Sequence, residues 1–143
     1  MSVNLSKYNI ETSVRFMGVL EDKLKYNVLK KGDLFIMPSM FENFGSAIVE
    51  AMSVGLPIIT TSGTPWNKIN ELGAGWCVDR NFSDIRDALI EGINLTDLER
   101  EFMGNISRKI SDDYKEEKVI NDLKHLYEWQ IHKTKRPDFI ILD

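Results

Sequence analysis

The sequence predicts an α/β fold, in which a parallel sheet is flanked by helices, and three observations lead to this prediction. Short apolar runs alternate with segments of helical periodicity along most of the 143 residues. The runs Leu34–Met37 and Leu56–Thr60 are almost continuously apolar, which is typical of strands buried on both faces of a parallel sheet. Gly55 and Pro57 mark the passage from a helical segment into the second run. A chain of this length is expected to form one domain with one core.

Four strands are expected, and each comes from a short apolar run. They are placed at Val14–Val19, Leu34–Met37, Leu56–Thr60 and Gly75–Val78. A helical segment follows each of them, so the order is β-α-β-α-β-α-β with further helices behind it. Because parallel strands need crossover connections, this order indicates one parallel sheet with helices packed on its faces.

The helices are predicted from apolar spacing and from capping residues. They are expected at Glu21–Lys30, at Gly45–Val54, within Gly63–Leu72, after Ser83, after Thr96, and from Lys115 to Ile131. Ser83 is interpreted as an N-cap, and Thr96 with Glu99 has the pattern of a capping box. The last helix carries one apolar stripe, formed by Val119, Ile120, Leu123, Leu126 and Tyr127.

Composition and charge narrow the classes of function. The net charge of −4 gives no electrostatic reason to expect a nucleic acid as partner. Cys77 is the single cysteine, so no internal disulfide can form, which fits a reducing cytoplasm. No apolar run resembles a signal peptide or is long enough to span a bilayer. We therefore expect a cytoplasmic protein, with a peripheral position at the inner face of the membrane as a further option.

The C-terminal end is interpreted as a tail over about residues 133–143. It begins with the short basic run Lys133–Arg136, the one cationic cluster of the sequence. A solvated tail is the favoured interpretation, and contact with a lipid surface is the alternative.

Two loops lie where a ligand is expected. Pro38–Gly45 follows one predicted strand and Thr61–Asn67 follows the next. Ligands of open parallel sheets bind beyond the carboxyl ends of the strands, so both loops face the expected ligand edge. No spacing of Cys, His, Asp or Glu in the sequence suggests a metal site.

The first loop leads into a helix start that suits an anion. The backbone N–H groups of Asn43, Phe44, Gly45 and Ser46, together with the helix dipole, can hold a phosphate or a diphosphate. Gly45 has no side chain to obstruct the close approach of such a group.

Two glutamates, Glu42 in the loop and Glu50 in the helix, flank this helix start. Glu50 is expected to share a helix face with Ser46 and Ser53, where its carboxylate can accept two hydrogen bonds from a ribose diol. Glu42 then lies on the sugar side of the phosphates. An isolated pair of this kind is more often two solvated acids. Combined with the helix start, the pair describes a crevice suited to a nucleotide sugar.

The segment PSMFENFGSAIVEAMSVGLPIITT closely resembles the signature of family 4 glycosyltransferases with the GT-B fold. The usual form of that signature is P-S-x-x-E-x-F-G-x-x-x-x-E-A-M-A-x-G-x-P-V-I-A. The matching residues are Pro38, Ser39, Glu42, Phe44, Gly45, Glu50, Ala51, Met52, Gly55, Pro57 and Ile59. The segments VRFMGVLED and GTPWNKINELGAGWCVD resemble flanking parts of the family, so the resemblance covers roughly residues 12–130.

The resemblance implies a Rossmann-like domain, the C-terminal and donor-binding half of a GT-B fold. Glu42 would contact donor-sugar hydroxyls and Glu50 would bind the ribose, which makes both candidates for the catalytic site. The backbone of Asn43–Ser46 would meet the sugar and the diphosphate. The segment near the base would be Gly18, Val19 and Leu20. The family is thought to retain configuration by front-face displacement, so neither glutamate is assigned as a nucleophile.

The resemblance also implies parts that this sequence does not match. A complete enzyme has an acceptor domain, and it has a strand and helix with an Arg and a Lys before the segment matching Val14. Here thirteen residues precede Val14, and Lys7 is the basic one among them. We therefore expect residues 1–143 to form a single partial nucleotide-sugar-binding domain that is inactive alone.

The expected function is donor binding in a retaining glycosyltransferase of bacterial polysaccharide or glycolipid synthesis. The substrates would be a UDP- or GDP-linked sugar and a glycan or lipid-linked acceptor, with no cofactor. The alternative is a non-catalytic remnant or a module that binds a nucleotide or a protein. An uncovered sheet edge would recruit a partner, so a homodimer or a missing N-terminal domain is expected.

Overall fold

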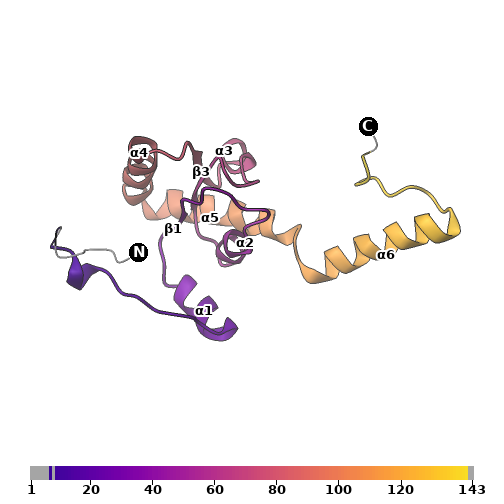
Figure 1. Ribbon diagram of the computed structural model, residues 1–143, viewed down its shortest axis with the longest axis horizontal. Coiled ribbons are helices and arrows are strands. Elements are labelled where there is room, and N and C mark those ends of the chain that lie inside the picture. The colour runs from indigo at the N-terminus through magenta and orange to yellow at the C-terminus, as the bar shows by residue number, and fades with distance from the viewer. Residues whose placement is uncertain (1–6, 8, 142–143) are drawn as a thin grey trace.

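Three parallel strands form the sheet in the computed structural model, which describes residue 7 and residues 9–141 (Figure 1). The strands are β1 (Phe35–Met37), β2 (Ile58–Thr61) and β3 (Gly75–Val78), and their order in the sheet follows the chain. The predicted class, a Rossmann-like α/β fold with a parallel sheet and flanking helices, is confirmed.

The register of the sheet puts β2 at its centre. Phe35 of β1 pairs with Ile58 of β2, and Ile58 pairs with Gly75 of β3. All four residues of β2 are buried, as the continuous apolar run predicted. Ile36 of β1 is 40% exposed, so the expectation that the first of the two runs is buried on both faces is wrong. The reason is its place at the edge of the described sheet, with one strand neighbour.

Seven helical segments complete the described part of the chain. They are the short 3-10 helix η2 (Glu11–Ser13) and the α-helices α1 (Asp22–Leu29), α2 (Ser46–Ser53), α3 (Lys68–Leu72), α4 (Phe82–Ile93), α5 (Asp97–Asp112) and α6 (Glu116–His132). The capping box of Thr96 and Glu99 is present at the start of α5. The N-cap of α4 is Asn81 and not Ser83, since the side chain of Asn81 accepts a hydrogen bond from the backbone N–H of Asp84.

The core lies between the sheet, α2 and α3. Its buried side chains belong to Ile48, Ala51, Met52, Leu56, Ile58, Trp66, Ile69 and Ala74. Helix α5 packs closely against the end of α2, because a Cβ atom on Gly104 would lie 2.2 Å from the carbonyl oxygen of Gly55. These contacts hold α2 in place against the sheet.

The predicted strand Val14–Val19 is wrong. These residues form an irregular segment that leads from η2 to α1. Their side chains are exposed, with Phe16 at 76% and Val19 at 102%. A strand needs a neighbouring strand to satisfy its backbone N–H and C=O groups. An apolar sequence favours a strand but does not ensure that such a neighbour is present. The described sheet therefore starts one strand later than expected.

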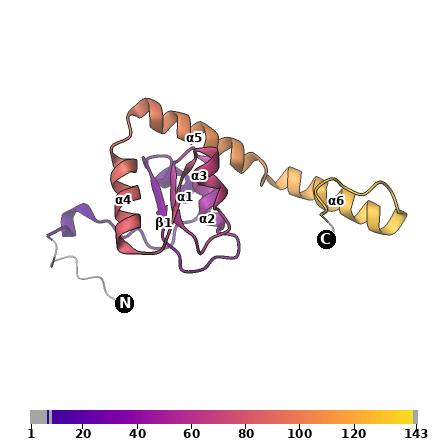
Figure 2. The ribbon, with the colours of Figure 1, turned by 90° about the horizontal axis from the view of Figure 1, so that it is seen from above.

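Helix α6 projects away from the sheet. Figures 1 and 2 show it extending to one side of the body, while the N-terminal segment extends to the other. No residue of α6 is buried, and Val119, Ile120, Leu123 and Tyr127 of its apolar stripe are exposed, while Leu126 is half-buried. The shape in these views is consequently elongated.

Candidate functional site

A cavity of about 370 Å³ opens along one face of α2, from Ser46 at its start to Ser53 at its end. Its lining comes from α1, from the loop after β1, from α2 and from the turn between α5 and α6. The lining residues are Tyr26, Phe44, Ser46, Val49, Glu50, Ser53, Ser111, Tyr114, Lys115 and Glu116. Three of the residues chosen from sequence, Phe44, Ser46 and Glu50, thus meet in one cavity, which we call the α2 cavity.

The start of α2 depends on Gly45. Its φ of 76° and ψ of 57° lie in the left-handed region, which glycine adopts without the steric penalty of other residues. A Cβ atom here would also lie 3.3 Å from side-chain atoms of Ile48, Met37 and Trp66. The chain therefore turns sharply into α2, and Gly45 itself is buried at this turn.

The first turn of α2 has the features of an anion site. The N-cap Gly45 offers no capping side chain, and Ser46 at the helix start is exposed. The first backbone N–H groups of a helix have no partner within it, and the helix dipole is positive at this end. The arrangement can therefore bind a negatively charged group, and the assignment of this helix start to a phosphate stays a prediction.

Glu50 lies on the face of α2 that was expected. It lines the α2 cavity with Ser46 and Ser53, while Ile48 and Ala51 are buried on the core side. Its Oε1 atom lies 2.7 Å from Nζ of Lys25, a residue of α1. The carboxylate is thus held at the mouth of the cavity by an ion pair between two helices.

Glu42 lies in the loop after β1 and does not line the α2 cavity. Its Oε1 atom accepts a hydrogen bond from Oγ of Ser39 at 3.3 Å, and its backbone N–H donates to the carbonyl of Gly63 at 3.0 Å. The residue is half-buried. Its backbone is therefore fixed between the two loops at the carboxyl edge of the sheet.

The two loops are bonded to each other below the cavity. Nε1 of Trp66 donates to the carbonyl oxygen of Phe44 at 2.5 Å, and Oγ1 of Thr61 donates to the carbonyl of Ser39. The rings of Phe44, Trp66 and Tyr114 pack together, with centroids 5.3–5.7 Å apart. Trp66 is 4% exposed and belongs to the buried core.

Gly18, Val19 and Leu20 lie in the exposed segment before α1, outside the α2 cavity. Val19 instead lines a separate opening of about 710 Å³ together with Glu21, Lys23 and Leu24. Gly18 has a φ of +66° with open space around its Cα. The structure therefore gathers the α2 residues but leaves this segment apart from them.

Sequence reasoning missed three residues beside the cavity. Lys25 was missed because it lies 25 positions before Glu50 and belongs to another helix. Tyr114 and Lys115 were missed because they lie in the turn between α5 and α6, and sequence patterns do not predict the angle between these helices. A hydrogen bond from Lys115 to Asp112, 2.8 Å away, and the charge of Asp112 raise the pKa of Lys115.

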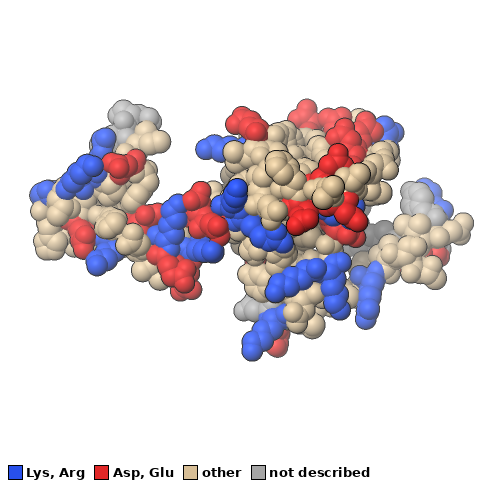
Figure 3. Space-filling view, turned by 180° about the vertical axis from the view of Figure 1, so that it is seen from behind, with Lys and Arg blue, Asp and Glu red and all other residues tan. Residues whose placement is uncertain are grey.

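Positive charge lies on the side of the body that carries α1. Lys23 and Lys25 belong to α1, and Lys30 and Lys31 follow it directly. Figure 3 shows lysine and arginine side chains gathered over the lower part of the body, where α1 lies. Of these lysines, Lys25 meets the α2 cavity through its ion pair with Glu50.

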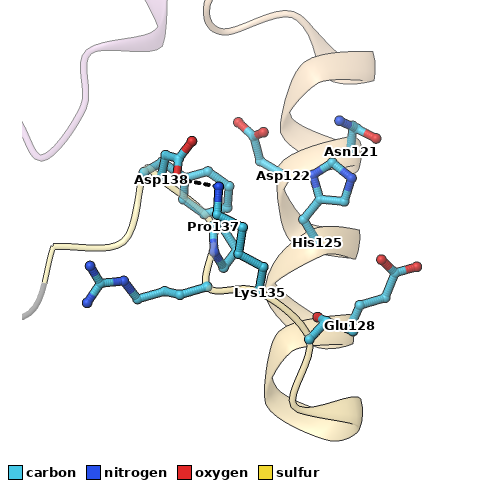
Figure 4. A pocket seen from close by; sticks show the side chains of 10 residues that line it. Asn121, Asp122, His125, Glu128, Lys135, Pro137 and Asp138 are labelled. Atoms are coloured by element: carbon cyan, nitrogen blue, oxygen red, sulfur yellow. Dashed lines mark ion pairs between the residues drawn. The ribbon is translucent and has the colours of Figure 1, made fainter.

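A second cavity, of about 380 Å³, lies between α6 and the residues after it (Figure 4). Thr134–Phe139 return along α6 and line this cavity together with Asp122, His125 and Glu128 of the helix. Nζ of Lys135 lies 3.7 Å from the carboxylate of Asp138 within this segment. Lys135 and Asp138 are almost fully exposed, so charged groups at the rim remain in contact with solvent.

The described residues hold neither a metal-binding cluster nor a membrane-spanning helix. Residue 7 and residues 9–141 contain no group of three or more His, Cys, Asp or Glu side chains that could hold a metal ion. No helix in that part of the chain is long and apolar enough to cross a membrane.

The fold and the α2 cavity define an α/β protein whose polar loops and helix start gather at the carboxyl edge of a parallel sheet. Residues 2–110 match the family described as glycosyl transferases group 1. This match covers well over half of the chain, so the protein belongs to that family.

Three relatives illustrate the similarity. A glycosyltransferase of Haemophilus influenzae is 31% identical over 85% of this chain and 35% of its own length. A sucrose synthase of Acidithiobacillus caldus is 35% identical over 54% of this chain and 10% of its own length. One subunit of the human phosphatidylinositol N-acetylglucosaminyltransferase is 44% identical over 38% of this chain and 11% of its own length. The alignments thus span about a third or less of each relative.

Proposed function

We propose that this chain is the donor nucleotide-sugar-binding part of a retaining family 4 glycosyltransferase, corresponding to the C-terminal half of a GT-B fold. The observation that carries the proposal is the meeting of Phe44, Ser46 and Glu50 in one cavity at the start of α2. This cavity combines a positive helix end with a carboxylate, which suits a ligand with anionic phosphates and a ribose diol.

The roles follow from the chemistry of each group. The backbone of Asn43–Ser46 binds the diphosphate, and Glu50 accepts hydrogen bonds from the ribose. Glu42 contacts hydroxyls of the donor sugar from the neighbouring loop. The segment Gly18–Leu20 borders the base. These groups therefore bind and orient the donor, and no protein nucleophile is assigned.

The names of the relatives support a sugar-transfer role. Sucrose synthases and part of an N-acetylglucosaminyltransferase are both found among the relatives. For this chain we propose a UDP- or GDP-linked donor, no separate cofactor, and a glycan or lipid-linked acceptor in bacterial polysaccharide or glycolipid synthesis. The site of action would be the cytoplasm, at or near the inner face of the membrane.

A second reading is a non-catalytic module that binds a nucleotide or a protein. One observation favours it: Glu42 does not line the α2 cavity, so the two candidate catalytic glutamates do not meet in one cavity. A donor-binding part and a nucleotide-binding module should both bind a nucleotide sugar, whereas a protein-binding module should not. Transfer by the 143-residue chain alone is expected under none of these readings.

We also propose that the apolar stripe of α6 pairs with a second copy of this chain. Its exposed fractions are 56% for Ile120, 47% for Leu123 and 62% for Tyr127. The helix begins with Glu116 and Glu117, and basic residues follow its end, at Lys133, Lys135 and Arg136. An antiparallel pair would place the acidic start of one helix opposite the basic end of the other.

A calorimetric screen of UDP-, GDP- and ADP-sugars tests the proposed function. We expect one class to bind with about millimolar affinity, on the order of −4 kcal/mol. Comparing affinities for ligands that share a base but differ in the sugar separates the contribution of the base from that of the sugar. Heats indistinguishable from dilution for all three classes, confirmed by NMR titration, would contradict nucleotide-sugar binding.

A further inference from the structure

The ion pair between Lys25 and Glu50 joins two helices at the α2 cavity. Nζ of Lys25 donates to Oε1 of Glu50 at 2.7 Å, within normal hydrogen-bond distance. The side chains are 30% and 25% exposed, so most of the surface of each is removed from solvent. The pair is therefore more ordered than a typical surface ion pair, whose net effect on stability is small.

The pair lies on the ligand side of α2 and not on its core side. Glu50 lines the α2 cavity, and so does Tyr26, the residue next to Lys25. The ammonium group of Lys25 lies 5.9 Å from the ring centroid of Tyr26. A change at Lys25 would therefore alter the orientation of a cavity-lining carboxylate.

The bond occupies one oxygen of the carboxylate. It is made by Oε1, and a carboxylate has further lone pairs on both oxygens. Fixing Oε1 restricts the rotation of the side chain, so Oε2 is presented in a defined direction. The ammonium group also offsets the negative charge of Glu50, which would otherwise repel a phosphate-bearing ligand.

We propose that Lys25 is a positioning residue for the ligand site: it orients and neutralises the Glu50 carboxylate so that this group can bind the ribose of an anionic nucleotide. The inference rests on the proposed function. Lys25 acts through Glu50 and makes no bond to the ligand. This sets a clear condition, because its effect on binding must disappear when Glu50 is no longer a carboxylate.

A double-mutant cycle tests that condition, with UDP and GDP as probes and NMR-monitored titration as the readout. Contacting residues couple strongly, so Lys25→Met should weaken the binding of the better probe by about fivefold or more. In a Glu50→Gln background the same change should weaken binding by less than about twofold. Lys25→Arg keeps a cation and should restore most of the affinity.

Two controls separate the positioning effect of Lys25 from an effect on folding and from the loss of one positive charge. Lys30→Met removes one exposed charge just beyond the same helix and should leave affinity within about twofold. Lys25→Gln replaces Lys25→Met if the latter loses the dispersed amide spectrum of the folded chain.

Each outcome decides the inference. If the wild type binds and Lys25→Met binds equally well, Lys25 has no role at the site and the inference fails while the proposed function stands. If Lys25→Met weakens binding equally in both backgrounds, Lys25 contacts the ligand itself and the positioning role is wrong. If the wild type binds neither probe nor any nucleotide sugar, the proposed function fails and this inference fails with it.

Discussion

The indole of Trp66 donates a hydrogen bond of 2.5 Å to the backbone carbonyl of Phe44, which links the loops after β1 and β2. The two rings also pack at a centroid distance of 5.7 Å. Trp66 belongs to the buried core, whereas Phe44 is 43% exposed and lines the α2 cavity. The core thus fixes the loop residue that precedes the start of α2.

Replacement of Trp66 by Phe should destabilise the fold, because it leaves a carbonyl without its donor. The bond is part-buried, so about 1–3 kcal/mol, the cost of losing the partner of a fully buried group, is an upper range here. The measurement is urea unfolding followed by circular dichroism, with a lower midpoint and an unchanged slope. Trp76→Phe is the control, since Trp76 donates to Oε2 of the exposed Glu91 at 2.7 Å. Equal losses for both variants would contradict a special role of the Trp66 bond.

Gly45→Ala should destabilise the chain more than Gly18→Ala. Both glycines have a positive φ, of +76° and +66°, so both variants pay the strain of a left-handed residue, about 1–2 kcal/mol. Only the Cβ atom at Gly45 would meet neighbours, three of them at 3.3 Å. Thermal unfolding of the two variants isolates this difference. A Gly18→Ala variant that is equally or more destabilised would show that packing around Gly45 is unimportant.

Cys77 should react slowly with iodoacetamide near neutral pH. Burial and, to a smaller extent, the charge of Asp79 raise the pKa of its thiol, and only the thiolate reacts. We expect the midpoint of the pH–rate profile to lie above that of an unstructured cysteine peptide. Asp79→Asn should lower it only in part, because burial is the larger cause. A profile that matches the peptide would contradict this prediction.

The same shift predicts a change of stability with pH. The folded chain binds the thiol proton more tightly than the unfolded chain does. The free energy of unfolding should therefore fall as the pH rises from the pKa of Cys77 in the unfolded chain toward its higher pKa in the folded chain. Comparison with Cys77→Ala, which should lack this part of the pH dependence, attributes the effect to the thiol.

The stripe of α6 should make the chain dimeric at micromolar concentration. Light scattering should give twice the monomer mass for the wild type, and Leu123→Glu should return it to monomer, since a charge would be buried in the pair. Asn121→Glu adds the same charge on the side of α6 that faces the second cavity and should remain dimeric. A wild type that is monomeric at all concentrations would contradict the pairing.

Sequence alone predicted the elements whose signals are local. Helix α2 was placed almost to the residue because Gly45 and Gly55 bound it and its apolar residues follow the helical period. The capping box of Thr96 and Glu99 needs only residues three apart. Strand β2 was predicted because a buried central strand is apolar throughout.

The misses depend on contacts that sequence patterns do not encode. The run at Val14–Val19 is apolar enough for a strand, but a strand forms only beside a partner. Asn81 and Ser83 are both good N-cap residues, and the backbone of α4 decided between them: Asn81 caps the helix, and Ser83 lies in the first turn with its hydroxyl donating to Asn81. Lys25 contacts Glu50 because α1 lies beside α2, and no local sequence pattern predicts how these two helices are placed.

The most direct test of the central claim is a titration of UDP and GDP into the wild type and into Glu50→Gln. One charge-assisted set of hydrogen bonds to a ribose contributes about 1.5–3 kcal/mol. The account predicts binding near millimolar for the wild type and a loss of roughly tenfold or more for the variant. An unchanged spectrum of the folded chain serves as the control for Glu50→Gln. Affinity that is the same in both proteins would contradict the assignment of the α2 cavity as the nucleotide site.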